Sequence, residues 1–238
     1  MKLFINTGGK GERLYPLTKD NPKPLVPISN KPVLHYLVEW AKKYEIKEII
    51  MMNGYKAEKI IDYVKDGKDF GINIVHSNEP RPLGSGGAIK FAKKHIDEEF
   101  VYISGDLLCA VDLKKMINFH KNHNADMTVF LHKSNHPHDS DILEINKDGK
   151  VERFISKDEK QNKTGNLSNA GLCIINPKIL DLMDKDEFTL ETYLYPKILE
   201  KNMRLFGYVS EEFISDMGTF DGLKKCETFL IDNKQLFS

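Results

Sequence analysis

The sequence predicts an α/β fold with a mostly parallel central sheet flanked by helices. Short apolar runs, typical of buried strands, alternate with longer segments whose apolar residues recur at helical spacing. This order favours parallel strands, because a crossover must carry the chain back before the next strand begins. At 238 residues the chain can bury a sizeable core, and we expect a single domain over residues 1–238.

The charge balance argues against nucleic acid as a partner. Lys and Arg together number 35, as do Asp and Glu, so the formal net charge is zero and no basic excess is present. The amino terminus runs directly into a strand without a signal-like segment, and no apolar stretch approaches membrane-spanning length. We therefore expect a cytoplasmic protein that does not enter a membrane.

The cysteines indicate neither a disulfide framework nor a structural zinc site. Cys109, Cys173 and Cys226 are odd in number, far apart, and form no Cys-x-x-Cys pair. We expect buried or unreactive thiols in a reducing compartment.

The first strand leads into a glycine-rich turn. The apolar run 3–5 stops before Gly8-Gly9-Lys10-Gly11, whose glycines let the backbone turn tightly and direct N–H groups at an anion. Arg13 and Lys23 follow and add cations. Fixed dipoles and mobile cations together are the chemistry that a polyphosphate needs.

Two competing phosphate motifs do not fit this turn. A dinucleotide fingerprint requires a third glycine where Leu14 stands, and the Walker A pattern requires Gly-Lys-Ser/Thr after a four-residue gap. Both are missing. A strand-to-helix turn that uses glycine only for its dihedral angles is the remaining alternative.

The next elements continue the alternation. Hydrophobic spacing predicts a helix over 31–43, a strand over 48–52, a helix over 57–64 and a strand over 72–76. The segment from Glu79 to Lys90 then forms an irregular loop rich in proline and glycine. We expect Ser85 to cap a helix over 86–95, and a plain loop-to-helix joint is the alternative to a ligand site.

The clearest buried strand, 100–104, ends in Gly105-Asp106. Ligands of open α/β sheets bind beyond the carboxyl ends of the strands, so we expect the Asp106 carboxylate to lie where a ligand binds. A carboxylate in that place suits Mg²⁺, which prefers oxygen ligands. A simple turn aspartate is the alternative. Asp112 is expected to cap the helix 113–122.

The second half combines strands with two helices. Asp148-Gly149, flanked by alternating residues over 142–155, predicts a hairpin. Residues 158–166 are expected to form a polar loop. Further strands are expected over 125–132, 167–175 and 204–209, and helices over 190–199 and 220–231.

The glycine-rich turn and the segment after it resemble a known signature. Gly8, Gly9, Gly11, Arg13, Leu14, Pro16, Leu17 and Thr18, followed by Pro22-Lys23-Pro24, are similar to the G-G-x-G-x-R-L-x-P-L-T and P-K-P motifs of the nucleotidyltransferases that activate sugar 1-phosphates. The resemblance implies a Rossmann-like nucleotidyltransferase fold over nearly the whole chain. One departure is Asn6-Thr7, which stands where the family has Leu-Ala in its base pocket.

Other segments carry the same resemblance. Pro82 to Ala88 is similar to the loop that meets base and ribose, and Asn169-Ala170-Gly171 to the strand that contacts the sugar. Asp216-Met217-Gly218-Thr219 matches the motif that supplies the second metal ligand. Lys157 aligns with the lysine of a Phe-x-Glu-Lys-Pro segment, although Ser156 and Asp158 replace its glutamate and proline.

The resemblance implies a role for each candidate residue. It places a nucleotide-binding half over 1–110 and a sugar-phosphate-binding half over 111–238. The catalytic residues are Arg13 and Lys23, and the metal ligands for Mg²⁺ are Asp106 and Asp216. The expected nucleotide-binding residues are Gly8, Gly9, Lys10, Gly11, Glu12, Arg13, Gly84 and Ser85. Glu79 is added to them on its own position, as the polar side chain best placed to accept hydrogen bonds from a base. The expected sugar-phosphate-binding residues are Lys157, Asn169 and Gly171.

The branch of the family is indicated less directly. The motifs are most similar to guanylyltransferases that act on mannose 1-phosphate or D-glycero-D-manno-heptose 1-phosphate with GTP, for surface polysaccharides. A thymidylyl-, uridylyl- or cytidylyltransferase with another phosphate acceptor is an alternative, as is a non-catalytic regulatory subunit that binds nucleotide sugars. No residue pattern indicates a homo-oligomer, although one is compatible with the resemblance.

The segment His136-Pro-His-Asp-Ser-Asp141 gathers two histidines and two aspartates. These residue types can ligate a metal, yet no third His or Cys group recurs at ligand spacing. We expect a polar loop at the rim of the sugar pocket, with a metal site as the alternative.

Overall fold

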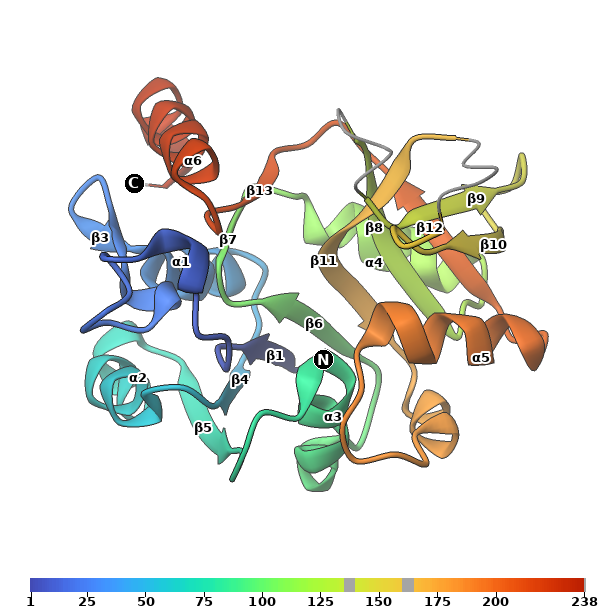
Figure 1. Cartoon of the computed structure of the whole chain (residues 1–238), viewed down its shortest axis with the longest axis horizontal. Helices are drawn as coiled ribbons and strands as arrows, with labels where there is room; N and C mark the ends of the chain where they lie inside the picture. Colours follow the sequence, from blue (N-terminus) through green and yellow to red (C-terminus); the bar gives the residue numbers. More distant parts are fainter. Residues whose placement is uncertain (135–139, 160–164, 238) are drawn as a thin grey trace. The chain divides into compact units, whose positions relative to one another are not determined.

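The computed structural model describes residues 1–134, 140–159 and 165–237 as two compact units (Figure 1). Unit 1 comprises Met1–Pro82, Ile103–Val111 and Glu212–Ser238, and unit 2 comprises Leu83–Tyr102 and Asp112–Glu211. The halves expected from the sequence, 1–110 and 111–238, differ from these units in two main places. Residues 83–102 belong to unit 2, and the carboxyl-terminal residues from 212 return to unit 1.

Unit 1 is built on parallel strands. β1 (Leu3–Asn6) pairs with β4 (Glu48–Asn53), and β4 pairs with β5 (Asn73–Asn78), both in parallel. In β1 and β4 the residues are buried one after another, as expected for strands that are covered on both faces. Helix α1 (Val33–Lys43) packs against β7 (Leu107–Cys109), and α2 (Ala57–Val64) packs against β5 (Figure 1).

The remaining elements of unit 1 are short, apart from its last helix. β2 pairs with β3, and β7 pairs antiparallel with β13. Their bounds are β2 Pro27–Ile28, β3 Lys31–Pro32, β13 Ile214–Asp216 and α6 Phe220–Asp232, with 3₁₀ turns at Glu12–Leu14, Lys23–Leu25, Lys68–Phe70 and Lys234–Leu236.

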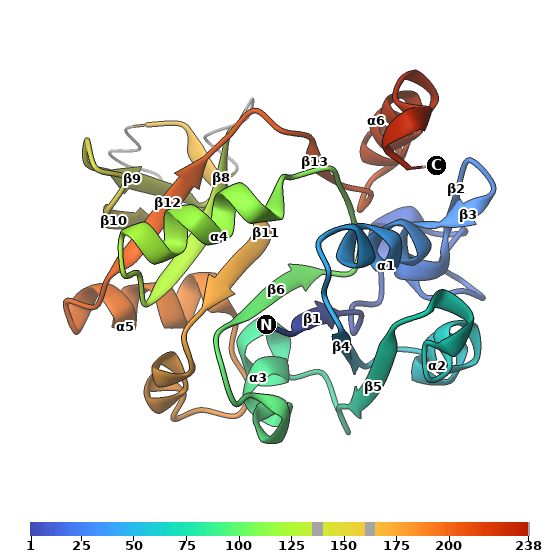
Figure 2. The ribbon, with the colours of Figure 1, turned by 180° about the vertical axis from the view of Figure 1, so that it is seen from behind.

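Unit 2 is mainly antiparallel. β11 pairs antiparallel with β8 and β9, β9 pairs antiparallel with β10, and β12 runs parallel to its neighbour β8. Helix α4 packs against β8 and β12 (Figure 2), and α5 packs against β10 and β12. The bounds are α3 Gly84–Phe91, α4 Leu113–Asn122, β8 Met127–Lys133, β9 Ile142–Ile145, β10 Val151–Ile155, β11 Leu167–Ile175, α5 Tyr195–Glu200 and β12 Leu205–Val209, with 3₁₀ turns at Lys93–His95 and Pro177–Leu182 and a π-helical turn at Leu190–Leu194.

The chain is therefore α/β, as predicted, with a mixed rather than a mostly parallel sheet. The hairpin of β9 and β10 and the long strand β11 account for the difference, because they add antiparallel pairs in unit 2. Strand β6 (Phe100–Ser104) has the predicted bounds and passes from unit 2 into unit 1. No helix in the described part of the chain has the length and apolar character that a membrane crossing requires.

Two helix predictions are corrected by the structure. The helix expected over 31–43 begins at Val33, because Lys31 and Pro32 pair with β2 as strand β3. The helix expected over 190–199 begins as the π-helical turn Leu190–Leu194 and becomes α-helical only from Tyr195. Asp112 caps α4 as predicted, since its carboxylate accepts hydrogen bonds from the N–H groups of Lys114 and Lys115.

A hydrophobic cluster in unit 1 anchors the segments that carry the candidate residues. Leu14, Leu108 and Met217 are completely buried in this cluster, which α1 and α6 complete. Arg13 precedes Leu14 and Asp216 precedes Met217, while Asp106 is two residues from Leu108. Packing of the apolar neighbour therefore fixes the backbone next to each polar residue.

Candidate functional site

The glycine-rich turn of unit 1 follows β1 directly. Asn6 ends the strand, and its side-chain oxygen accepts a hydrogen bond from the N–H of Gly8 at 3.3 Å. Gly11 adopts a left-handed conformation with φ +68°, which favours glycine, and the 3₁₀ turn Glu12–Leu14 begins there. A Cβ at Gly9 would meet nothing within 4 Å, so this part of the turn lies open.

Gly11 also allows the segment of Lys23 to pass close by. A Cβ at Gly11 would lie 3.0 Å from Cβ of Lys23 and 3.0 Å from Cγ2 of Thr18. The Thr18 hydroxyl donates a hydrogen bond of 2.9 Å to the carbonyl oxygen of Gly11. This packing brings Lys23 from the second motif against the turn of the first, and its ammonium group forms an ion pair with Asp106.

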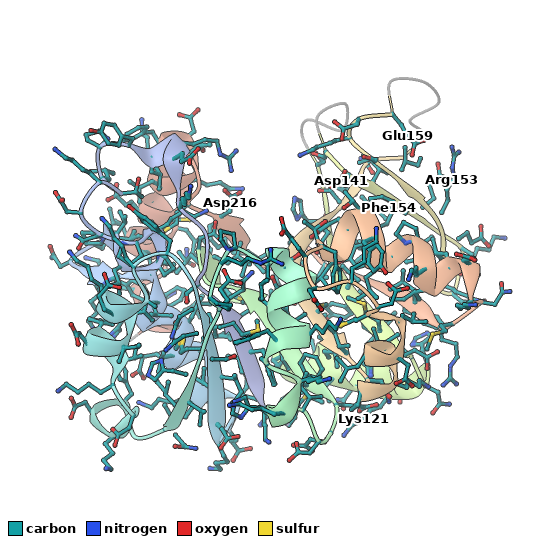
Figure 3. All side chains as sticks on the ribbon, turned by 60° about the horizontal axis from the view of Figure 1, so that its bottom comes forward. Lys121, Asp141, Arg153, Phe154, Glu159 and Asp216 are labelled. Carbon is teal, nitrogen blue, oxygen red and sulfur yellow. The ribbon has the colours of Figure 1, made fainter. Side chains whose placement is uncertain are left out.

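Asp216 ends strand β13, and Asp106 directly precedes the neighbouring strand β7. Asp216 pairs with Leu107 in the antiparallel ladder of β13 and β7, and the N–H of Met217 donates to the carbonyl oxygen of Asp106 at 3.0 Å. Figure 3 shows Asp216 on this segment. A pairing of two three-residue strands thus joins residues that are 110 positions apart in the sequence.

Gly218 lies where the charged groups meet. A Cβ at this position would lie 2.7 Å from Oδ1 of Asp216, 3.0 Å from Nη2 of Arg13 and 3.6 Å from Nζ of Lys23. The N–H of Gly218 also donates to Oδ1 of Asp216 at 2.9 Å. Arg13, Lys23, Asp106 and Asp216, all predicted from the sequence, therefore form one charged cluster in unit 1.

A small cavity of about 110 Å³ borders this cluster. It is lined from the glycine-rich turn, the Lys23 segment and the end of β6, by Asn6, Thr7, Gly9, Lys23, Pro24, Ser104 and Asp106. Backbone N–H groups, a cation and a carboxylate share this lining. The cavity combines the donors and the charge that a phosphate group requires.

The donor set of the cluster fits Mg²⁺. Asp106 and Asp216 offer carboxylate oxygens, the ligands that this hard cation prefers, and Mg²⁺ commonly combines one or two carboxylates with substrate phosphates and water. Within residues 1–134, 140–159 and 165–237 no three His, Cys, Asp or Glu residues are grouped so as to hold a metal ion. Two carboxylates leave coordination positions that substrate phosphates and water would fill.

Glu79 lies against the turn from the end of β5. A Cβ at Gly54 would lie 2.4 Å from Oε1 of Glu79, and one at Gly8 would lie 2.8 Å from the same oxygen. Thr7 does not face outward: its buried hydroxyl donates to Oδ1 of Asn53 at 2.8 Å. The Thr7 hydroxyl is thus satisfied within the protein, and the Glu79 carboxylate adds a negative charge beside the turn.

Lys10 and Glu12 are exposed charged residues of the turn. Their side chains are 61% and 81% exposed and form a loose ion pair of 3.9 Å between Nζ and Oε1. An exposed pair of this kind contributes little to stability. Both side chains can reorient when a ligand arrives.

The remaining candidates lie in unit 2, and the capping role expected for Ser85 is wrong. Helix α3 already begins at Gly84, so that Ser85 is helical, and the N–H groups of Gly86 and Gly87 donate to the carbonyl oxygen of Phe188. The Ser85 hydroxyl instead accepts a hydrogen bond of 2.9 Å from the N–H of Leu190. A distant segment therefore provides the partners that a local cap would have provided.

Asn169 and Gly171 form an irregular part of β11. The register to β8 shifts between Asn169 and Cys173, and Gly171 adopts φ +79°. The N–H of Gly171 donates to Oδ1 of Asn169 at 2.9 Å, and Nδ2 of Asn169 donates to Oε1 of Glu191 at 2.9 Å. One N–H and one lone pair of the Asn169 amide are left for further bonds.

Lys157 is exposed just after β10, beside Asp141. Its backbone N–H donates to Oδ1 of Asp141 at 2.7 Å. Figure 3 shows Asp141 close to the start of β9. Of the histidine-rich segment expected at the rim of the sugar pocket, 136–139 lie outside the described residues, and only Ser140 and Asp141 are described.

Glu191 was missed by the sequence reasoning. It lies in the π-helical turn Leu190–Leu194, and burial raises the pKa of its carboxyl group above the usual value. An acidic residue within an apolar helical pattern gives no sign that its partners are Ser85 and Asn169, which are far away in the sequence. The hydroxyl of Ser85 also donates a hydrogen bond to this carboxylate.

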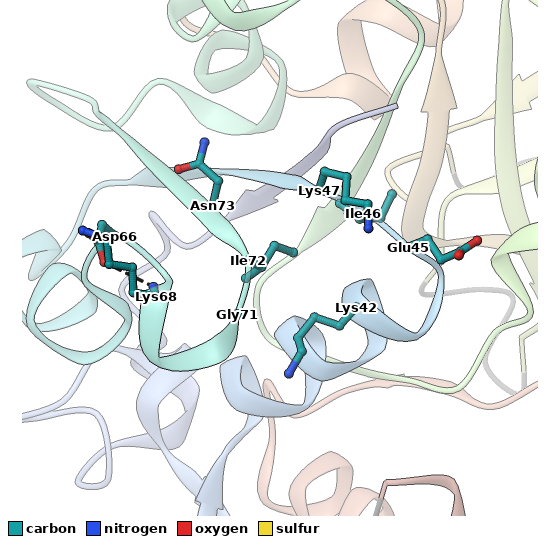
Figure 4. A pocket seen from close by; sticks show the side chains of 9 residues that line it. All are labelled: Lys42, Glu45, Ile46, Lys47, Asp66, Lys68, Gly71, Ile72 and Asn73. Atoms are coloured by element: carbon teal, nitrogen blue, oxygen red, sulfur yellow. Dashed lines mark hydrogen bonds and ion pairs between the residues drawn. The ribbon is translucent and has the colours of Figure 1, made fainter.

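A further cavity of about 570 Å³ lies at the amino-terminal side of β4 and β5 (Figure 4). It is lined by Lys42, Glu45, Ile46, Lys47, Asp66, Lys68, Gly71, Ile72 and Asn73. Lys68 is paired with Asp66, and none of the sequence-predicted residues reaches this cavity. The glycine-rich turn instead follows the carboxyl end of β1, and Glu79 follows that of β5, where α/β sheets bind ligands.

Comparison with known proteins shows which family and which relatives this chain is similar to. The family model for "Nucleotidyl transferase" matches residues 3–233. The chain is 36% identical over 230 residues to D-glycero-alpha-D-manno-heptose 1-phosphate guanylyltransferase of Aneurinibacillus thermoaerophilus, covering 95% of this chain and 97% of the relative. It is 32% identical over 224 residues to mannose-1-phosphate guanyltransferase 2 of Candida glabrata, covering 92% of this chain.

The chain spans only 61% of the length of this Candida relative and of three other mannose-1-phosphate relatives. Among solved structures, HddC from Yersinia pseudotuberculosis complexed with GMP-PN is 31% identical, with a TM-score of 0.81. The match covers 96% of this chain and 99% of that chain.

Proposed function

Because the chain belongs to the nucleotidyl transferase family, we propose that it transfers GMP from GTP to a sugar 1-phosphate. A phosphate oxygen of the sugar 1-phosphate attacks the α-phosphorus of GTP and forms a new P–O bond. The bond from the α-phosphorus to the bridging oxygen breaks, and pyrophosphate leaves with the electron pair. The products are a GDP-sugar and pyrophosphate.

The observation that carries this proposal is the cluster around Gly218. Two cations, Arg13 and Lys23, and two carboxylates, Asp106 and Asp216, share one small region beside the glycine-rich turn. No protein nucleophile is needed, because the attacking phosphate is anionic at neutral pH. The barrier is the approach of two anions, which positioning and charge neutralisation lower.

Each member of the cluster then has a distinct role. Lys23 stabilises the charge that develops at the α-phosphate, while Arg13 and the turn amides neutralise the leaving pyrophosphate. Asp106 and Asp216 would hold Mg²⁺, which supplies charge neutralisation at the phosphate oxygens. The ion pair of Lys23 with Asp106 keeps both groups in place before the substrates arrive.

The preference for guanine is assigned to Glu79. Guanine presents adjacent N–H donors on one edge, and a carboxylate accepts two such bonds at once. Glu79 lies against Gly8 and Gly54, next to the turn that precedes the phosphate cluster. The relative from Aneurinibacillus thermoaerophilus, a guanylyltransferase by name, and the GMP-PN complex of HddC support the same choice of GTP.

The acceptor is assigned to unit 2. The exposed Lys157 contributes a cation for the sugar phosphate, and Asn169 offers its remaining N–H and lone pair to a sugar hydroxyl. Gly171 leaves the backbone of β11 without a side chain in this place. We propose heptose or mannose 1-phosphate as the acceptor, and surface-polysaccharide synthesis in the cytoplasm as the use of the product.

The test is pyrophosphate release with Mg²⁺ across four NTPs, each combined with mannose, heptose and glucose 1-phosphates. We expect release with GTP and one or both of the first two sugars. Release only with another NTP would overturn the assignment of guanine as the base. If no combination released pyrophosphate, the proposed reaction would be overturned.

Variants of the aspartates sharpen this test. Asp106→Asn and Asp216→Asn should each remain folded while turnover falls by orders of magnitude. Asp112→Asn is the matched control: Asn is as good a helix cap as Asp, and this residue lies outside the cluster. Near-normal turnover of either cluster variant would contradict the role of the two carboxylates.

A further inference from the structure

A carboxylate in unit 2 joins two segments that lie far apart in the sequence. Glu191 accepts a hydrogen bond of 2.9 Å from Nδ2 of Asn169 on β11, and another from the hydroxyl of Ser85 on α3. Ser85 and Asn169 were both predicted as ligand contacts, Ser85 for the nucleotide and Asn169 for the sugar. One acidic side chain thus holds a member of each predicted contact set.

Backbone groups hold the same two residues a second time. The N–H of Leu190, next to Glu191, donates to Oγ of Ser85 at 2.9 Å. The N–H of Gly171 donates to Oδ1 of Asn169 at 2.9 Å. With both ends of its amide engaged, Asn169 is fixed in orientation, so that its remaining N–H and lone pair point in defined directions.

The groups around Glu191 favour hydrogen bonds to its carboxylate. Burial, and then the negative charge of Asp141, raise the pKa of its carboxyl group, whereas the bonds from Asn169 and Ser85 lower it. Asp141 is itself held by the N–H of Lys157, the third predicted contact. A partly buried carboxylate next to another acid is costly, and its hydrogen bonds offset that cost.

We propose that Glu191 is a positioning residue that sets the Ser85 end of α3 and Asn169 on β11 in one fixed arrangement. It acts on the substrates through these neighbours and makes no contact with the reacting atoms. This inference rests on the proposed function, since it assigns Ser85 to the nucleotide and Asn169 to the sugar phosphate. It predicts that one side chain governs the binding of both substrates.

The kinetic test compares Glu191→Ala with Glu191→Gln. Glutamine retains an oxygen that accepts from Asn169 and Ser85, whereas alanine removes the acceptor altogether. We expect Glu191→Ala to raise KM for both GTP and the sugar 1-phosphate by roughly ten- to a hundredfold, with a smaller change in kcat. Glu191→Gln should restore both KM values to within about threefold of the parent.

Thr192→Ala provides the matched control. Thr192 is the next residue in the same turn, is exposed, and hydrogen-bonds only with Thr189 among the contacts that the structure gives it. It should leave both KM values unchanged. If Glu191→Ala lowers the melting temperature and leaves both KM values unchanged, Glu191 is merely structural and the inference fails. If Glu191→Gln is as impaired as Glu191→Ala, the charge itself is required, and the inference also fails.

A measurement without substrate separates this inference from the proposed function. Amide hydrogen exchange of Leu190 and Gly171 reports the two backbone bonds to Ser85 and Asn169. In Glu191→Ala both amides should exchange faster, while Val129, buried within β8, keeps its protection. Unchanged exchange at both amides would overturn the positioning role. If the unsubstituted protein releases no pyrophosphate with any NTP and sugar 1-phosphate of the panel, only the proposed reaction is overturned.

Discussion

Lys23 and Asp106 form an ion pair in which the side chains are only 15% and 17% exposed. The two residues come from the second sequence motif and from the end of β6, and the passage of Lys23 over Gly11 brings them together. Removing one partner of such a pair leaves a shielded charge uncompensated. The pair therefore links the stability of the turn to the chemistry of the cluster.

Replacing Lys23 tests that link. Lys23→Met keeps much of the apolar length of the side chain and removes the charge, so we expect turnover to fall by about 100-fold or more, as when a transition-state donor is removed. Thermal unfolding and kcat should be measured together. The control is Lys31→Met, at an exposed position of β3. A lower melting temperature with unchanged turnover would refute the phosphate role of Lys23.

The space at Gly218 gives a second prediction. In Gly218→Ala the new Cβ would lie 2.7 Å from Oδ1 of Asp216 and 3.0 Å from Nη2 of Arg13, so both head groups must shift. We expect the Mg²⁺ concentration for half-maximal activity to rise by about tenfold, because displacement by a fraction of an ångström weakens a metal ligand. A metal titration of activity measures this. An unchanged Mg²⁺ requirement would place the metal away from Asp216.

The sequence predicted most of the elements and the members of the charged cluster. β6 and β11 have the expected bounds, and Asp112 caps α4, because in these cases the local pattern and the tertiary contacts agree. The motif residues Arg13, Lys23, Asp106 and Asp216 lie in one cluster of unit 1, and their catalytic and metal-binding roles stay predictions. Their grouping depends on apolar neighbours, and the hydrophobicity of these neighbours predicts that they are buried.

The features that the sequence did not predict depend on contacts between segments that are distant in the chain. The Ser85 cap failed because the carbonyl of Phe188 accepts from the first N–H groups of α3. The pairing of β7 with β13 involves three residues on each side, too few for a periodic pattern. Glu191 gained its role only through Ser85 and Asn169, and no local rule connects a π-helical turn to these partners.

Stability should fall in mild acid because of His120. This buried imidazole in α4 contacts Oγ1 of Thr128 at 2.8 Å, and burial lowers its pKa below the usual 6.5, although Glu99 and Asp126 oppose that shift. The folded protein therefore binds a proton less readily than the unfolded chain. Its contribution is present above pH 6.5 and is lost as the pH falls through that value towards the folded pKa.

Urea unfolding at pH 7.5 and 5.5 measures this effect. Because His35 also has a lowered pKa, the comparison must be with His120→Gln, which keeps a polar partner for Thr128. The loss of unfolding free energy between the two pH values should be smaller in the variant. Equal losses in both proteins would exclude His120 as the source.

The three cysteines should react slowly with thiol reagents, in line with the sequence expectation. Cys109, Cys173 and Cys226 are free and buried. Burial raises the pKa of Cys109 to about 12 and that of Cys226 to about 11, so the reactive thiolate is scarce at pH 8. A disulfide reagent should label three thiols per chain in denaturant and almost none in the native protein. Rapid labelling of the native protein would contradict the packing around these residues.

The most direct test of the account follows the phosphorus atoms of GTP. With heptose or mannose 1-phosphate and Mg²⁺, label in the α-phosphate should appear in the nucleotide sugar, and label in the γ-phosphate should appear in pyrophosphate. Both transfers should be lost in Asp106→Asn. Transfer of the γ-label to the sugar, or release of the α-label as free GMP, would contradict nucleotidyl transfer and with it the central claim.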